Sequence, residues 1–168
     1  MEFKKYLMEN IIITGFDPEG FDSDSNSIAQ DSKEIYKIFS KRGLNILRNK
    51  EILFIAKNEK GEVLGGVVAE WDSFERGRYN DDEEEETINS FSFDVATKEE
   101  NSFSFVGPKL IDAALRHYES EKHLYEDMNG GKTIIKLEVI NPKLESFIIR
   151  RYPKYKWQKS GANLVSSV

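Results

Sequence analysis

A strand-to-helix transition between Phe91 and Tyr118 constrains the fold more than any other stretch of this sequence. Phe91, Phe93 and Val95 alternate with polar residues, which is the period of a half-buried strand. A polar run follows, and Pro108 suits the first position of a helix. The apolar residues of that helix recur on one face: Leu110, Ile111, Ala114, Leu115 and Tyr118. The exposed N–H groups of a first helical turn can bind phosphate, so the stretch predicts either a phosphate site or an ordinary strand–loop–helix connection.

The chain length and residue usage favour one globular domain. We expect a single domain over residues 1–168, with an N-terminal arm, first strand and loop over 1–27 and a core over 28–168. The absence of cysteine excludes disulfides, thiolate metal sites and a cysteine nucleophile. His117 and His123 are six residues apart, which is not the helical spacing of a metal pair, so we expect structural or solvated roles and no metal. The sequence has neither a ~20-residue apolar span nor a secretory start, so we expect no membrane partner and a cytoplasmic location.

The acidity of the chain is local. Its net charge is −6, and residues 81–86 are six consecutive acids, so the remainder is balanced. Because no basic stripe stands out, we expect no nucleic-acid partner. The acidic run predicts a solvated loop between two adjacent strands, which either attracts a cationic acceptor or is simply a solvated turn.

The order of periodic segments predicts a mixed sheet with helices on its faces, in the α/β (α+β) class. Strands are expected at residues 11–14, 52–57, 63–71, 91–95, 133–139, 155–158 and 163–167. Helices are expected at residues 32–42, from Pro108 onward and from Pro142 onward. Asp31 and Glu34 resemble a capping box for the first of these helices. Gly65 and Gly66 inside a strand indicate a bulge or a close backbone approach.

Three segments resemble the GCN5-related N-acetyltransferase (GNAT) superfamily over residues 52–168, and more weakly over 11–42. The run LEVINP at residues 137–142, followed by Phe147, resembles the family's second conserved block, in which a strand meets an Asn that opens a helix. The hairpin EILFIAKNEKGEVLGGVVAEW resembles the family's central hairpin, and residues 106–115 resemble the start of its acyl-CoA helix. The resemblance implies a mostly antiparallel sheet with helices on both faces and acetyl-CoA, or another acyl-CoA, as cosubstrate.

The resemblance also implies a cofactor site with an altered pyrophosphate loop. The family pattern is Arg or Gln, two residues, Gly, one residue, then Gly or Ala. Gly107 matches its last position, whereas Phe105 and Ser102 replace the first glycine and the Arg or Gln. The backbone of Val95 would orient the acyl carbonyl. The residues implied in cofactor binding are Val95, Phe103, Ser104, Phe105, Val106, Gly107, Lys109 and Asn141.

The resemblance to the family's catalytic positions is incomplete. Ile148 occupies the position of the tyrosine that often serves as general acid, and Tyr152 lies one turn further on. Glu70 and Asp94 are the candidates for the general base, directly or through a water. The function implied is direct acyl transfer to a primary amine of a small molecule or peptide, cationic amines included. The alternatives are a catalytically degenerate binding or interaction module of the same fold and an unrelated α+β structural protein; a homodimer is left open.

Overall fold

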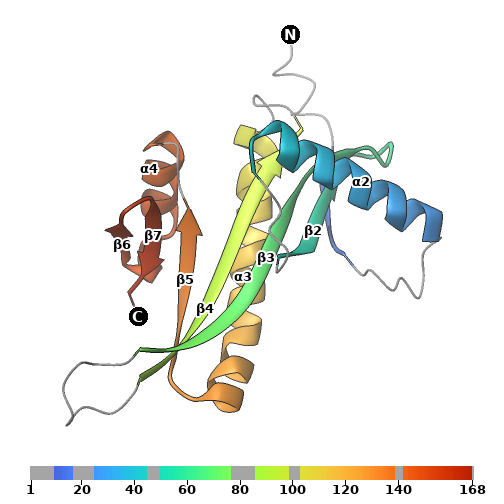
Figure 1. The fold of residues 1–168 in the computed structure, drawn as a ribbon. Coiled ribbons are helices and arrows are strands. Elements are labelled where there is room, and N and C mark those ends of the chain that lie inside the picture. Colours follow the sequence, from blue (N-terminus) through green and yellow to red (C-terminus); the bar gives the residue numbers. More distant parts are fainter. Residues whose placement is uncertain are drawn as a thin grey trace. The chain divides into compact units, whose positions relative to one another are not determined.

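The computed structural model describes residues 10–16, 25–44, 50–76, 86–98, 103–138 and 142–167. Its elements follow one another as β1 (Ile12–Gly15), α2 (Ser25–Lys41), β2 (Glu51–Lys57), β3 (Val63–Arg76), β4 (Glu86–Thr97), α3 (Phe103–Asn129), β5 (Lys132–Glu138), α4 (Pro142–Arg151), the 3-10 turn η2 (Pro153–Tyr155), β6 (Trp157–Ser160) and β7 (Asn163–Ser166) (Figure 1). The expected arm at residues 1–9 and residues 81–85 of the expected acidic loop at 81–86 lie outside the described residues, whereas Glu86 is the first residue of β4 and not part of a loop. None of the described helices combines the length and apolar character that a membrane crossing requires.

The described strands form one sheet in the order β1-β2-β3-β4-β5-β7-β6. The β1–β2, β2–β3, β5–β7 and β6–β7 pairs are antiparallel, whereas β4 and β5 are parallel and are joined by the crossover helix α3. The mixed, mostly antiparallel sheet expected from the sequence is therefore confirmed.

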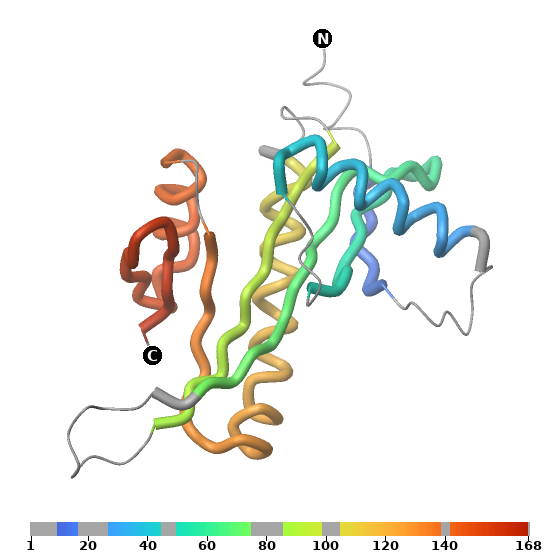
Figure 2. The backbone as a smooth tube through the Cα atoms, viewed as in Figure 1, coloured from blue at the N-terminus to red at the C-terminus, as the bar shows by residue number. Residues whose placement is uncertain are grey.

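Close packing of the backbone divides the chain into two compact parts. The first part comprises Met1–Ala69 and Val95–His117, and the second comprises Glu70–Asp94 and Tyr118–Val168. Strands β3 and β4 and helix α3 each contribute residues to both parts, and their paths can be followed in Figure 2. The single domain over residues 1–168 stays a prediction, and each part is described by itself below.

In the first part, helix α2 packs its apolar stripe on the sheet. The buried cluster joins the α2 residues Ile35, Ile38 and Phe39 to strand residues Ile55, Val63, Val68 and Ala96. Helix α2 begins seven residues earlier than the expected residue 32, so the capping-box interpretation of Asp31 is wrong. Asp31 instead lies within the helix and forms an ion pair with Lys57, 2.6 Å from Nζ to Oδ2.

Gly65 and Gly66 mark the close approach that the sequence predicts. A Cβ on Gly65 would lie 2.6 Å from the Ala96 carbonyl oxygen and 3.3 Å from Cδ1 of Leu110 in α3. A Cβ on Gly66 would lie 2.6 Å from Cδ1 of Ile35 in α2. Because adjacent strand residues point to opposite faces, α2 and the first half of α3 cover opposite faces of β3.

In the second part, a group of aromatic side chains packs together in the core. The Trp71 ring stacks on Tyr125 with ring centroids 4.0 Å apart and on Tyr118 at 5.8 Å, and it lies 4.9 Å from the ring of Phe91. Phe91 and Tyr118 are almost fully buried. Since large aromatic residues dominate core energetics, this cluster holds the second half of α3 against β3 and β4.

Candidate functional site

The pairing of β4 with β5 stops before either strand ends. The parallel ladder runs from Ile88↔Lys132 to Ser92↔Lys136, after which β4 continues five residues to Thr97. Strand β5 ends at Glu138 and pairs on its other edge with β7. Among the described residues, β5 therefore pairs with β4 only as far as Ser92, and residues 93–97 of β4 follow that point. Val95, expected from the family resemblance to orient an acyl carbonyl, lies within this segment.

The end of β4 is anchored from two sides within the first part. The Arg42 guanidinium donates from Nε and Nη2 to the carbonyl oxygen of Thr97, at 3.3 and 3.2 Å. The Lys98 N–H donates to the Leu64 carbonyl at 2.7 Å. Hydrogen bonds from a charged donor are stronger than neutral ones, so Arg42 is an effective anchor. Sequence reasoning missed Arg42 because this contact joins residues 55 positions apart and no local pattern signals it.

Helix α3 begins at Phe103, five residues before the expected start at Pro108, so Phe103–Gly107 form helical turns and not a loop. The earlier start is explained by burial: Val106 and Leu110 are fully buried one turn apart and extend the apolar stripe. Pro108 costs this helix one hydrogen bond because it has no N–H. The first helical turn, whose N–H groups have no acceptor within the helix, is therefore the turn that begins at Phe103, and not the turn directly before Leu110.

The corrected position of Phe105 reverses the expected effect of replacing it. If its ring obstructed a phosphate loop, Phe105→Gly would tighten binding; instead the residue is half-buried in α3. We expect Phe105→Gly to lower the free energy of unfolding by about 2–3 kcal/mol. The low helix propensity of glycine contributes ~1 kcal/mol of this loss, and the lost burial of the apolar ring contributes the rest. Arg116→Gly, at an exposed position of the same helix, should cost only ~1 kcal/mol. Urea unfolding measures both variants. If they lose the same free energy of unfolding and Phe105→Gly also binds CoA more tightly, Phe105 obstructs a phosphate-binding loop as first expected.

The remaining residues implied in cofactor binding are only partly placed by the structure. Val95, Gly107 and Lys109 fall in the first part, where Gly107 is buried within α3 and Lys109 is exposed on it. Ser104 lies in the first turn of the same helix. Asn141 lies outside the described residues, so its role stays a prediction.

The two candidate bases lie on neighbouring strands in the second part, and both are partly exposed. Trp71 contacts Phe91, so Glu70 and Asp94, by alternation, lie on the opposite face of their strands. The Ser73 hydroxyl donates to Asn89 Oδ1 at 2.6 Å across the same two strands. This contact fits the register in which Trp71 lies opposite Phe91. From this register we infer that Glu70 lies opposite Ser92, a diagonal neighbour of Asp94 at about 7–8 Å.

Ile148 stands where the family resemblance implies a general acid, and its side chain is apolar. Ile148 is 3% exposed and packs in the core of the second part. Tyr152 follows α4; its hydroxyl accepts a hydrogen bond from Arg151 Nε at 3.2 Å, and its carbonyl accepts one from the Trp157 indole at 2.9 Å. These contacts hold Tyr152 at the exit of the helix.

A charged cluster in the second part joins α3 to η2. The Glu119 carboxylate accepts hydrogen bonds from the Tyr155 hydroxyl at 2.9 Å and from Lys154 at 3.0 Å, and it pairs with Lys122 at 2.8 Å. Burial alone would raise the pKa of Glu119, but these three hydrogen bonds outweigh it and lower the pKa to about 2. Burial, and then the bond to Glu119, raises the pKa of Tyr155 above its ordinary value. An ionised carboxylate paired with a protonated phenol is a structural arrangement, unsuited to proton transfer near neutral pH.

The two histidines have different surroundings. The His117 ring makes an edge contact with Phe54, with ring centroids 6.1 Å apart, in the first part. The side chain of His123 is 73% exposed and lies 3.4 Å from Glu126 in the second part. Within the described ranges, no three His, Asp or Glu side chains gather so that they could hold a metal ion.

Comparison with known proteins finds similarity only among solved structures. No protein-family model matches the sequence, and no curated protein matches it. One similar structure is the GCN5-related glucosamine N-acetyltransferase region of a fungal multi-domain GH3 β-N-acetylglucosaminidase, with 15% identity and a TM-score of 0.48. The match covers 91% of this chain but only 17% of that protein.

Two further similar structures are of comparable size to this chain. AtaT complexed with acetyl-methionyl-tRNAfMet is 12% identical with a TM-score of 0.47, over 93% of this chain and 94% of that one. A tyrosine-to-phenylalanine mutant of KacT is 13% identical with a TM-score of 0.49, over 92% and 93%. The similarity to these three structures extends over most of this chain, at 12–15% identity and TM-scores of 0.47–0.49. At these identities the likeness concerns the fold alone.

Proposed function

We propose that this protein is an acyl-CoA-dependent N-acyltransferase that transfers an acetyl or related acyl group to a primary amine. The observation that carries the proposal is the end of the β4–β5 ladder at Ser92, with β4 continuing to Thr97. The amides of the pantetheine arm can pair with a strand edge in the manner of an added strand. The first turn of α3 follows β4 closely in sequence and offers N–H groups for the pyrophosphate.

The chemistry follows from what these residues can supply. The amine attacks the thioester carbonyl carbon, and the Val95 N–H donates to the carbonyl oxygen as negative charge develops there. The C–S bond breaks, the amide forms and CoA leaves as the thiolate. Glu70 or Asp94, or a water that one of them holds, takes the amine proton. Ile148 cannot protonate the thiolate, so the thiolate takes its proton from solvent, and positioning of the reactants supplies much of the rate.

Calorimetric titration with acetyl-CoA tests the binding half of this proposal. We expect weak but measurable binding, because Ser102 and Phe105 replace residues that usually hold the pyrophosphate. Arg42→Lys keeps the charge but loses the paired hydrogen bonds to Thr97, and it should weaken binding about 10-fold. Lys41→Gln, at the exposed neighbouring position, should leave binding unchanged. Absence of heat at millimolar acetyl-CoA would overturn the proposal.

The second candidate function is a non-catalytic interaction module, and the buried Ile148 at the general-acid position favours it. The two functions separate in a transfer assay with labelled acetyl-CoA and a panel of amines. The panel should hold polyamines, lysine-containing peptides and aminoacyl-tRNA, since the acceptor class is not fixed by any residue described above. Binding of CoA without transfer to any of these amines would favour the interaction module.

A further inference from the structure

The pairing of β4 with β5 shows that a lysine shares the sheet face of the candidate bases. Ser92 pairs with Lys136 in the last step of the parallel ladder. Paired strand residues point to the same face, and the face alternates along each strand. Thr133 of β5 points toward α3, because its hydroxyl oxygen accepts a hydrogen bond from Tyr118 at 3.2 Å. Lys136, three residues further along β5, and its partner Ser92 therefore lie on the face opposite to α3.

Both candidate bases lie on this same face within the second part. Asp94 follows Ser92 by two residues on β4, and Glu70 lies opposite Ser92 on β3 in the register inferred above. Glu70, Ser92 and Lys136 thus form one row across three strands. Neighbouring strands are about 4.8 Å apart, so the Cα atoms at the two ends of the row are about 10 Å apart. An acid and a lysine can therefore reach the two ends of one small molecule that lies over Ser92.

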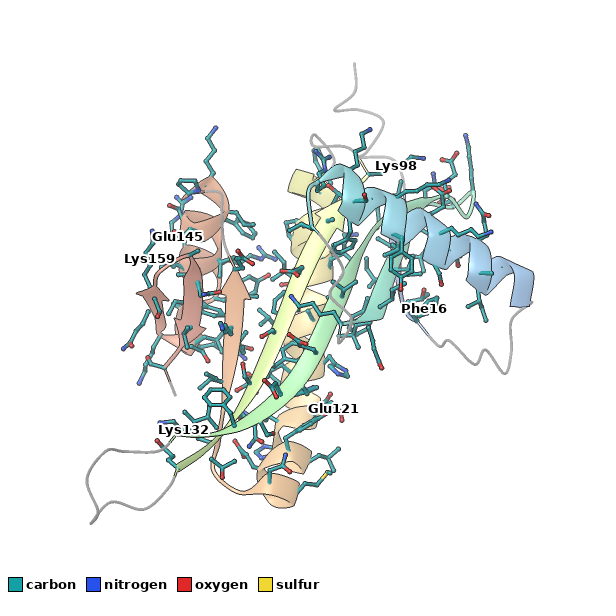
Figure 3. All side chains as sticks on the ribbon, viewed as in Figure 1. Phe16, Lys98, Glu121, Lys132, Glu145 and Lys159 are labelled. Atoms are coloured by element: carbon teal, nitrogen blue, oxygen red, sulfur yellow. The ribbon has the colours of Figure 1, made fainter. Side chains whose placement is uncertain are left out.

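Lys136 differs from the other lysine on this face of β5 in its surroundings. Lys132, at the start of the strand (Figure 3), pairs with Glu86 at 3.0 Å. Lys136 is exposed, and among the described residues it forms no ion pair. Its charge is therefore available to an anionic group of a ligand, whereas the charge of Lys132 is already paired within the sheet.

We propose that Lys136 is a specificity-determining residue that selects α-amino acids as acceptors of the acyl group. The inference rests on the proposed acyl transfer and adds the class of its acceptor. Lys136 binds the acceptor carboxylate through a charge-assisted hydrogen bond, and the acceptor amine lies toward Glu70 and Asp94. The N–C bond of the amide forms, the C–S bond of the thioester breaks, and the amine proton goes to one of these two carboxylates, directly or through a water.

A diamine or polyamine fits this row of side chains less well. One of its cations could approach Glu70 or Asp94, but a second cation nearby would lie beside Lys136, and like charges placed together weaken binding. The acids on this face would attract any amine. The lysine is therefore the group that discriminates between amines with and without a carboxylate, by attracting the first and repelling the second kind.

A transfer assay with labelled acetyl-CoA and matched pairs of acceptors tests the proposal on the full chain. Each pair is an α-amino acid and the amine that lacks its carboxylate: phenylalanine with phenethylamine, leucine with 3-methylbutylamine, and lysine with cadaverine. Lys136→Gln should lower kcat/KM for the preferred amino acid about 10–100-fold, because a hydrogen bond between charged groups is lost. It should change kcat/KM for the matched amine less than about 3-fold. Lys136→Glu should reverse the preference, in favour of cadaverine over lysine.

Lys132→Gln is the matched control, since it removes the same charge from the same face of the same strand. It should leave the ratio of kcat/KM within each pair unchanged, and thermal unfolding should show that all three variants fold. If transfer proceeds but Lys136→Gln keeps the wild-type ratios, or if Lys132→Gln changes them equally, the proposal for Lys136 is overturned while acyl transfer stands. If none of the amines accepts an acyl group, with or without a carboxylate, the proposed function is overturned and the acceptor assignment with it.

Discussion

Replacing Gly131 with alanine is expected to lower the free energy of unfolding by about 3 kcal/mol or more, from strained backbone and overpacking together. Gly131 has a φ of +75°, which side-chain-bearing residues rarely adopt. A Cβ at this position would lie 1.9 Å from the Thr87 carbonyl oxygen and 2.6 Å from its carbon. Because the obstacle is the backbone of β4, no side-chain rotation can relieve the clash.

The neighbouring glycine is a matched control. Gly130 has a φ of +71°, but a Cβ there would meet nothing within 4 Å. Gly130→Ala should therefore cost only the backbone term, about 1 kcal/mol. Urea unfolding of both variants measures the difference. Equal losses would show that the contact with Thr87 is not limiting and that the turn shifts to accommodate a methyl group.

The turn at Gly130 and Gly131 determines the register in which the parallel strand β5 pairs with β4. Figure 2 shows the chain reversing between the end of α3 and the start of β5. The fully buried Asn89 of β4 donates to the Gly130 carbonyl at 3.0 Å and accepts from Asn129 at 3.1 Å, fixing the turn to the strand. A displaced turn would shift the register of Ile88↔Lys132, and with it the point at which the ladder ends.

Local patterns were sufficient to predict the order of strands and helices. The alternation of Phe91, Phe93 and Val95 with polar residues predicted β4. The prediction that the first helix ends near Gly43 is confirmed, because α2 ends at Lys41 and Gly43 has a φ of +71°. The start of α3 was predicted wrongly because Pro108 resembles a first-turn proline. The free energy gained by burying Val106 instead favours an earlier helix, and burial by distant strands is not visible in a local pattern.

The candidate site was less predictable than the fold. Glu70 and Asp94 were selected because the family resemblance implies a carboxylate base on a central strand. Alternation places both on one face only once the contact between Trp71 and Phe91 shows which faces of the two strands match. Arg42 was missed because its carbonyl acceptor, Thr97, is remote in sequence.

If the protein transfers acyl groups, replacing its general base should lower kcat by about 10²–10⁴-fold. The sequence contains no cysteine, and within the described residues His117 packs on Phe54 while His123 pairs with Glu126. Glu70 and Asp94 are therefore the groups to test. Glu70→Gln and Asp94→Asn keep the shape and polarity of each side chain, so we expect both variants to fold and one of them to show the loss.

Asp72→Asn is the matched control for this experiment. Asp72 is exposed on β3, two residues beyond Glu70 and on the same face by alternation, and its carboxylate accepts a local hydrogen bond from the Ser73 N–H at 2.9 Å. Its replacement should change kcat less than about 3-fold, since no proton transfer depends on it. A steady-state assay with acetyl-CoA and an accepted amine measures all three variants. If kcat falls equally in all three, the effect is electrostatic and not general-base catalysis, because a base acts from one position only. If kcat is unchanged in all three, the amine proton leaves through solvent, and neither carboxylate has the role proposed for it.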